Sequence, residues 1–66
     1  MDSFEIVNAM MNGATLEIYS QECKDDVACA YVDEKQVSVS QAVRASQNPI
    51  VKVIGKSGNW SAYTAQ

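Results

Sequence analysis

The sequence predicts an α+β fold: a small antiparallel sheet of about four strands with two short helices on one face, in the order α-β-β-α-β-β. Two segments carry apolar residues at three- and four-residue spacing and end in residues that break helices. Four further segments alternate apolar and polar residues or are rich in β-branched residues, and short polar turns join them in pairs. Such pairs favour hairpins, and helices on one side leave a broad face of the sheet open to water.

The first helix is expected over residues 4–11, with Asp2 or Ser3 as its N-cap. Asn12-Gly13 then gives the chain a left-handed exit. The same Asn-Gly pair is a strong hairpin signal, so an alternative interpretation makes residues 5–11 a strand. The helix is preferred because two adjacent methionines and an alanine have better helix than strand propensity. The apolar side of this helix is expected to hold Phe4, Val7, Met10 and Met11.

Two strands are expected next, over residues 15–19 and 27–32, joined by the polar loop 21–26. Residues 33–36 are expected to turn the chain back, and residues 37–39 either extend a strand or enter the second helix. The alternation in the first strand predicts inward side chains at Leu16 and Ile18 and outward ones at Thr15, Glu17 and Tyr19.

The second half repeats this order, which suggests a doubled αββ unit. Ser40 is expected to cap a helix over residues 41–46, and Asn48-Pro49 ends it because proline has no amide donor and disfavours helical angles in its predecessor. Residues 50–54 are β-branched at four of five positions and predict a strand, and residues 60–64 predict its return. The residues between these two strands are typical of a turn: Gly55-Lys56-Ser57-Gly58-Asn59.

The size of the chain predicts one domain, residues 1–66, that buries only roughly 60% of its unfolded surface and so often needs a partner. With 47% hydrophobic residues the chain is too apolar to be disordered, and no run approaches the roughly 20 apolar residues that span a bilayer. Residues 1–5 lack the pattern of an export signal. A cytoplasmic location without membrane attachment is therefore predicted.

No enzymatic activity, cofactor or metal site is expected. The sequence lacks histidine, the usual base for a Ser or Cys nucleophile. Asp25-Asp26 and Asp33-Glu34 are expected in solvated turns rather than in a dry catalytic pocket. Gly55-Lys56-Ser57 lacks the earlier glycine and the following helix of a phosphate-binding loop.

The two cysteines, Cys23 and Cys29, lie close enough in sequence for a disulfide to close the loop between them, although a reducing compartment would keep both as thiols. We expect Cys29 to be a small buried strand residue and Cys23 a loop residue. Two thiols supply only half of a tetrahedral zinc site.

Charge divides the chain into two halves. Residues 1–34 hold all eight acidic residues and one basic residue, a net charge of −7, whereas residues 35–66 hold four basic residues and no acid, a net charge of +4. This asymmetry either indicates a charged partner or arises because the two halves fold against each other in one sheet.

Aromatic residues beside positive charge are the remaining functional signal. Such a sheet face could stack bases and hold phosphates, or form a protein interface, in which Tyr, Trp and Arg are enriched. In the purely structural interpretation, Trp60 completes the core and the tyrosines shield the sheet. The expected partner contacts are Tyr19, Lys52, Lys56 and Tyr63, with Asp25 and Asp26 as a second, acidic patch.

The segments 37–46, 50–54 and 58–63 resemble small proteins of bacteriophages and prophages, among them a type I-F anti-CRISPR family with a Ser-Gln-Ala helix start and a Gly-x-Trp-x-Ala-Tyr strand. Residues 4–13 also resemble the helix-then-glycine beginning of many short phage proteins. The better of these two resemblances covers less than half of the chain. It implies a small non-catalytic protein that blocks a host complex by occupying a surface.

Together these features predict a non-enzymatic phage or mobile-element protein that binds and inhibits or modulates a host protein or ribonucleoprotein complex by protein–protein contact. One alternative is a small nucleic-acid-binding module that uses the basic half. Four basic residues there, against eight acidic residues in the other half, provide only weak electrostatic attraction for nucleic acid. A second alternative is a self-associating, antitoxin-like or structural protein that buries its apolar residues in a homodimer.

Overall fold

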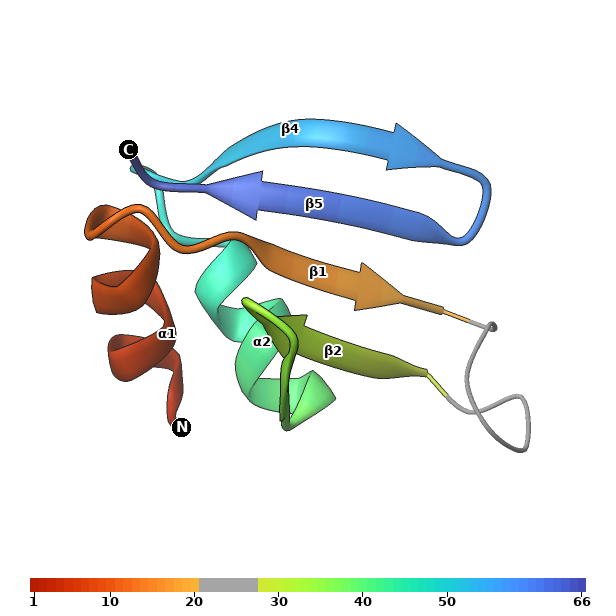
Figure 1. Cartoon of the computed structure of the whole chain (residues 1–66), viewed down its shortest axis with the longest axis horizontal. Helices are drawn as coiled ribbons and strands as arrows, with labels where there is room; N and C mark the ends of the chain where they lie inside the picture. The colour runs from red at the N-terminus through yellow and green to blue at the C-terminus, as the bar shows by residue number, and fades with distance from the viewer. Residues whose placement is uncertain (21–27) are drawn as a thin grey trace.

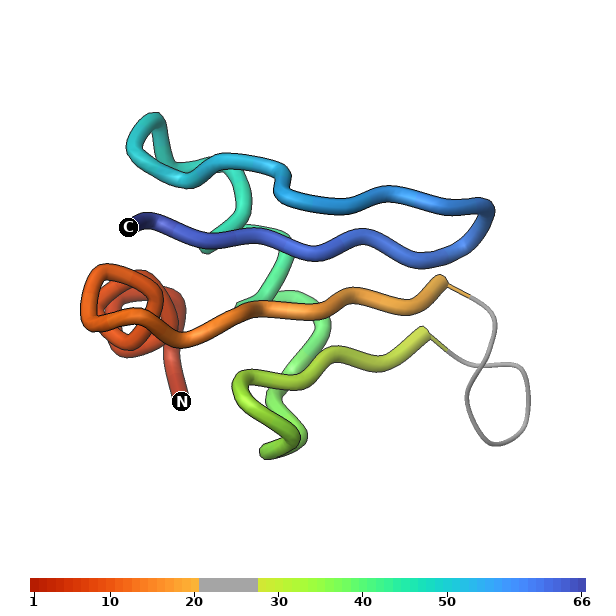
Figure 2. Tube along the Cα trace, turned by 45° about the horizontal axis from the view of Figure 1, so that its top comes forward, coloured from red at the N-terminus to blue at the C-terminus, as the bar shows by residue number. Residues whose placement is uncertain are grey.

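A computed structural model of the chain describes residues 1–20 and 28–66 (Figure 1). Five strands form one antiparallel sheet in the order β3-β2-β1-β5-β4, and both helices pack on the same face (Figures 1 and 2). The α+β prediction is confirmed, with five strands rather than about four. The elements are α1 (Ser3–Met11), β1 (Leu16–Tyr19), β2 (Cys29–Val32), β3 (Lys35–Val37), α2 (Val39–Ser46), β4 (Lys52–Ser57) and β5 (Trp60–Thr64).

The additional strand is β3, which occupies part of the segment expected to be a turn. Only Asp33 and Glu34 turn the chain, with φ angles of 46° and 73°. Two consecutive positive φ angles are what a tight two-residue hairpin loop requires. Lys35 therefore pairs with Val32 at once, and β3 continues along β2.

Helix α1 forms as the sequence predicts, and the alternative strand over these residues is wrong. Asp2 is the N-cap: its carboxylate accepts a hydrogen bond from the Glu5 amide at 2.9 Å, and the Glu5 side chain accepts one from the Asp2 amide at 3.2 Å. This reciprocal pair is a capping box. Asn12 ends the helix, and Gly13 takes the left-handed exit with a φ of 102°.

The apolar side of α1 differs from the expected one. Ile6 and Met10 are fully buried, whereas Phe4 is 84% exposed and Met11 is 52% exposed. Apolar residues occur on several sides of this helix, so the periodicity alone did not decide which stripe meets the sheet. Packing against α2 and the sheet decides it.

The N-cap of α2 is Ser38 rather than Ser40, because the helix begins at Val39. Ser38 makes no side-chain capping bond; its hydroxyl instead lies 2.9 Å from that of Ser40. After the helix, the Asn48 side chain accepts a hydrogen bond from the Ile50 amide at 3.1 Å. This local turn delays the start of β4 to Lys52, later than expected.

The turn between β4 and β5 is also shorter than predicted. β4 continues to Ser57, so only Gly58 and Asn59 connect the strands, and Gly58 has a φ of 52°. Gly55, expected in the turn, lies inside β4 next to a register shift between Val53 and Gly55.

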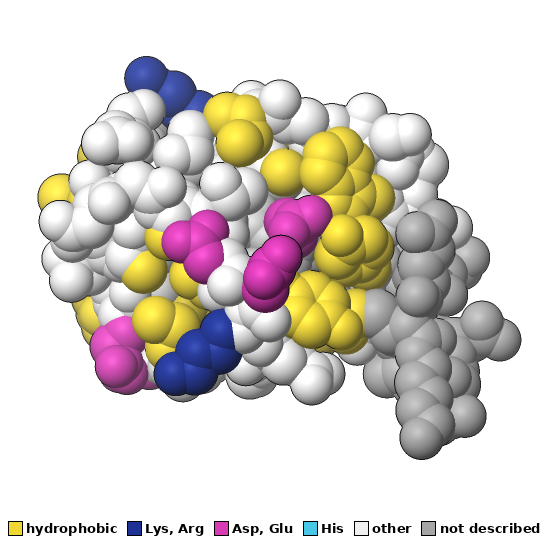
Figure 3. Space-filling view, viewed as in Figure 1, with side chains coloured by type: hydrophobic (Ala, Val, Ile, Leu, Met, Phe, Trp, Pro, Cys, Tyr) yellow, Lys and Arg dark blue, Asp and Glu magenta, His cyan; other side chains and the backbone are white. Residues whose placement is uncertain are grey.

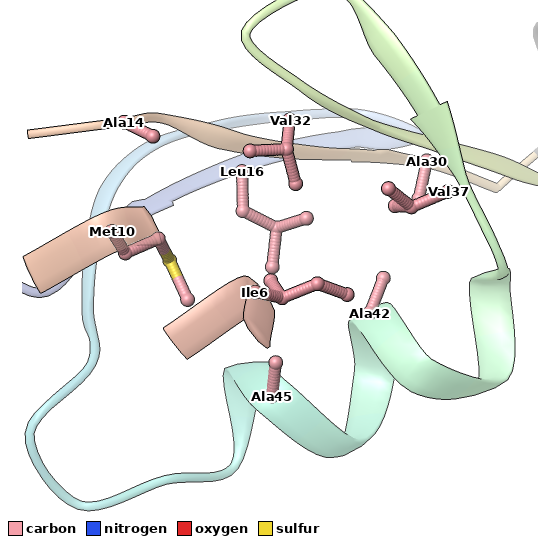
Figure 4. Packing of buried hydrophobic residues seen from close by; sticks show 9 residues of the cluster. All are labelled: Ile6, Met10, Ala14, Leu16, Ala30, Val32, Val37, Ala42 and Ala45. Atoms are coloured by element: carbon pink, nitrogen blue, oxygen red, sulfur yellow. The ribbon is translucent and has the colours of Figure 1, made fainter. Parts of the chain in front are cut away.

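The core lies between the helices and the sheet, and its residues come from both halves of the chain (Figure 4). Strand β1 pairs with β5, which joins the two halves at the centre of the sheet. The central strand of the first half, β1, directly follows α1. The central strand of the second half, β5, is instead the last strand, after β4, so the halves are not equivalent repeats. The buried cluster is Ile6, Met10, Ala14, Leu16, Ala30, Val32, Val37, Ala42 and Ala45.

Cys29 is buried at the start of β2, as expected, with 4% of its surface exposed. It is disulfide-bonded, which decides between the disulfide and the thiol that the sequence left open. The other cysteine, Cys23, lies outside the described residues. Sequence spacing permits such a bond but does not decide it, because the bond depends on how the chain brings two thiols together.

Candidate binding surface on the open sheet face

The face of the sheet that the helices do not cover carries a cluster of aromatic residues around one carboxylate. The predicted alternation in β1 is confirmed: Leu16 is in the core and Ile18 packs against it, so Glu17 and Tyr19 point to the open face. In the sheet register, Glu17 lies opposite Tyr31 and Tyr19 lies opposite Trp60. We call Glu17, Tyr19, Tyr31 and Trp60 the aromatic patch.

The Cη2–Cζ3 edge of the Trp60 indole reaches Gly55 in the neighbouring strand. A Cβ added at Gly55 would lie 2.8 Å from Cη2 and 3.0 Å from Cζ3 of the indole, closer than real Cβ atoms approach. Only glycine lets the ring come this near to the backbone of β4. The ring also explains why Ala62, on the same face as Gly55, is only 4% exposed. Trp60 remains half-buried.

The carboxylate of Glu17 links two of the rings. Its Oε2 atom accepts a hydrogen bond from the Tyr19 hydroxyl at 2.9 Å and another from the Trp60 indole Nε1 at 3.1 Å. The rings of Tyr19 and Tyr31 meet edge to face, with centroids 5.9 Å apart and planes at 78°. These contacts hold the side chains of the patch in one arrangement.

The charge next to the patch is negative. Figure 3 shows hydrophobic side chains in a column near one end of this face, with acidic side chains directly beside them. The Lys and Arg side chains visible in the same view lie away from the column. Among the described residues, the aromatic rings of the open face therefore lie beside negative charge, and Lys52, which pairs with Thr64 on this face, lies at the opposite end of β4 from Ser57, the partner of Trp60.

The residues expected to contact a partner do not gather on one face. Tyr19 belongs to the aromatic patch, but Tyr63 aligns with Leu16 and packs against the core on the helix side. Tyr63 and Lys56 line a shallow hollow of about 230 Å³ on that side. Lys52 is exposed on the edge strand β4. Asp25 and Asp26 lie outside the described residues.

Sequence reasoning placed Tyr31 and Trp60 on strands but did not include them, or Glu17, among the expected contacts. The signal was present: Glu17 and Tyr19 are outward positions of an alternating strand. What was missing was the register between strands, which sets Tyr31 and Trp60 beside them.

A second recess, of about 270 Å³, lies between the two helices on the opposite side of the molecule. Phe4, Val7 and Arg44 contribute to its lining. No sequence pattern indicates this recess, because it depends on how α1 crosses α2.

Within residues 1–20 and 28–66, no cluster of three or more potential metal-binding side chains occurs. The helices in this part of the chain are too short or too polar to cross a membrane. No protein-family model, curated protein or solved structure matches the chain.

Proposed function

We propose that the protein is a non-enzymatic binding protein that contacts a host protein or ribonucleoprotein complex through the aromatic patch. The observation that carries this proposal is a preorganised set of half-buried aromatic rings on a sheet face that neither helix covers. Tyr and Trp supply large contact area at little entropic cost, and they are enriched among residues that dominate binding energy. The resemblance to phage proteins makes a bacterial complex in the cytoplasm the first partner to test.

Protein binding is favoured over nucleic-acid binding by the positions of the charges. Bases could stack on the rings, but Glu17 at the centre of the patch repels phosphate. Arg44 lines the recess between the helices and Lys56 lines the hollow on the helix side, whereas Lys52 is on the open face but at the end of β4 remote from Trp60. Oligonucleotide titration at low and high salt tests this, because phosphate-driven binding weakens steeply as salt rises.

The proposal is tested by affinity capture from bacterial lysate with the wild-type protein and two variants. Tyr31→Ala removes a ring from the patch, and Phe4→Ala removes an equally large ring that is 84% exposed on the helix side. We expect the wild type and Phe4→Ala to recover the same protein in stoichiometric amount, and Tyr31→Ala to lose about tenfold or more in affinity. Recovery that depends on Phe4 but not on Tyr31 would contradict the proposal.

Self-association through the edge strand β4 is a second candidate, supported by its exposed apolar side chains. Val53 is 59% exposed and Ile54 is 55% exposed. The register shift at this point and the flanking lysines Lys52 and Lys56 oppose it, because bulges and charges blunt sheet edges. Sedimentation at micromolar concentration tests this candidate, because a monomer under these conditions would exclude self-association as a homodimer.

A further inference from the structure

We infer that the aromatic patch takes an arginine side chain from its protein partner, with the guanidinium stacked on Trp60 and paired with Glu17. This inference rests on the proposed function and specifies the chemistry of the partner. It starts from the composition of the patch, in which a carboxylate lies among three aromatic rings. Both kinds of group attract a cation, the carboxylate by its charge and the rings by the negative potential of their faces.

The geometry of Trp60 provides the stacking surface. The Cη2–Cζ3 edge of the indole lies against Gly55 in β4, and Trp60 is only half-buried, so part of the ring is open to a ligand. Trp offers the most favourable ring for a cation. A partner side chain laid on this ring would cover its exposed part without disturbing the core.

The geometry of Glu17 provides the charge at the edge of the same ring. The indole N–H points to Oε2, so the carboxylate lies beside the ring in the direction of its nitrogen. The Tyr19 hydroxyl donates a hydrogen bond to the same oxygen. These two hydrogen bonds orient the carboxylate, and Oε1 takes part in neither. The negative charge is thus oriented before any partner arrives.

This arrangement favours arginine over lysine. A guanidinium is planar, stacks on an aromatic face and donates N–H groups outward in its own plane, so one group can contact the indole and reach the adjacent carboxylate together. An ammonium is a compact, strongly hydrated charge that cannot stack. The charge of Glu17 attracts either cation, so the contact between the planar guanidinium and the ring is what distinguishes arginine from lysine.

The experiment uses the intrinsic fluorescence of Trp60, which is the only tryptophan in the chain. The full chain is titrated with a short Gly- and Ser-flanked peptide that carries one central arginine, and with matched peptides that carry citrulline or lysine. Citrulline has nearly the shape of arginine but no charge. We expect a saturable change in Trp60 emission with the arginine peptide, and at least about tenfold weaker binding of the citrulline and lysine peptides.

Two charge-neutralising variants locate the site. Glu17→Gln keeps an oxygen acceptor for Tyr19 and Trp60 but removes the charge, whereas Glu34→Gln removes the same charge from an exposed position in the β2–β3 turn. We expect Glu17→Gln to weaken the arginine peptide about tenfold and Glu34→Gln to change it less than about twofold. Thermal unfolding of both variants confirms that they are folded.

Three outcomes overturn the arginine site: no saturable change below about 10 mM peptide, equal binding of the arginine and citrulline peptides, or unchanged binding by Glu17→Gln. Equal binding of the lysine peptide overturns the preference for a guanidinium. If capture of a cellular protein depends on Tyr31 but not on the charge of Glu17, the proposed function stands and this inference fails.

Discussion

At the scale of single residues, the contact between Trp60 and Gly55 shapes the open face. The sequence predicts Gly55 as a turn residue, since it lies in a run of turn-forming residues, and the structure places it in β4 under the indole. A glycine inside a strand usually marks a close approach by another group. That approach comes from Trp60 on the neighbouring strand, which no local pattern around Gly55 reveals.

Gly55→Ala should therefore disturb the aromatic patch. The new Cβ would lie 2.8 Å from the indole, so the ring must shift, and overpacking of this kind typically costs about 1–3 kcal/mol. We expect a lower unfolding midpoint in urea together with a changed Trp60 emission maximum. Ser57→Ala, at an exposed position of the same strand, serves as the control and should change neither quantity. An unchanged emission spectrum in folded Gly55→Ala would show that the ring does not lie on this glycine.

At the scale of elements, the two helices begin in physically different ways. Asp2 satisfies an amide at the start of α1 and completes a capping box, whereas Ser38 occupies the same position in α2 without making a side-chain bond. Both residues belong to the group preferred at N-caps, so sequence preference does not separate them. The difference arises because the Ser38 hydroxyl lies beside that of Ser40 instead of an amide.

This difference predicts unequal effects of two matched substitutions. Asp2→Ala should lower the free energy of unfolding by about 1 kcal/mol, because it leaves the Glu5 amide without its capping acceptor and removes a favourable charge at the helix start. Ser38→Ala should cost clearly less, since it removes no capping bond. Urea unfolding of the two variants measures both values. Equal losses would mean that Ser38 caps its helix in solution.

At the scale of the whole molecule, the pairing of β1 with β5 makes the two halves of the chain one structure. Acidic and basic halves share a single sheet, which agrees with the structural interpretation of the charge asymmetry. Leu16 lies at this junction: it is fully buried and aligns with Tyr63 across the two strands. Loss of this side chain should weaken both halves together.

Leu16→Ala is expected to lower the free energy of unfolding by about 2–5 kcal/mol through lost burial and a new cavity. In so small a protein this is a large part of a total stability of about 3–10 kcal/mol. Trp60 fluorescence reports the unfolding of the C-terminal half, and the amide signals of α1 report the unfolding of the N-terminal half. We expect both probes to give the same unfolding midpoint. Leu16→Met, which nearly conserves volume, should cost less than about 1.5 kcal/mol. Separate midpoints for the two probes would show that the halves unfold independently.

The sequence by itself determined the fold class, both helices, the outward positions of Glu17 and Tyr19, and the buried position of Cys29. These features follow from local spacing, capping and turn residues, which act within a few positions along the chain. Tertiary structure alone decided which side of α1 is buried, the presence of strand β3, the contact of Trp60 with Gly55 and the grouping of Glu17 with Tyr31 and Trp60. Each of these depends on strand register or helix packing between segments far apart in sequence, and no short-range pattern encodes that information.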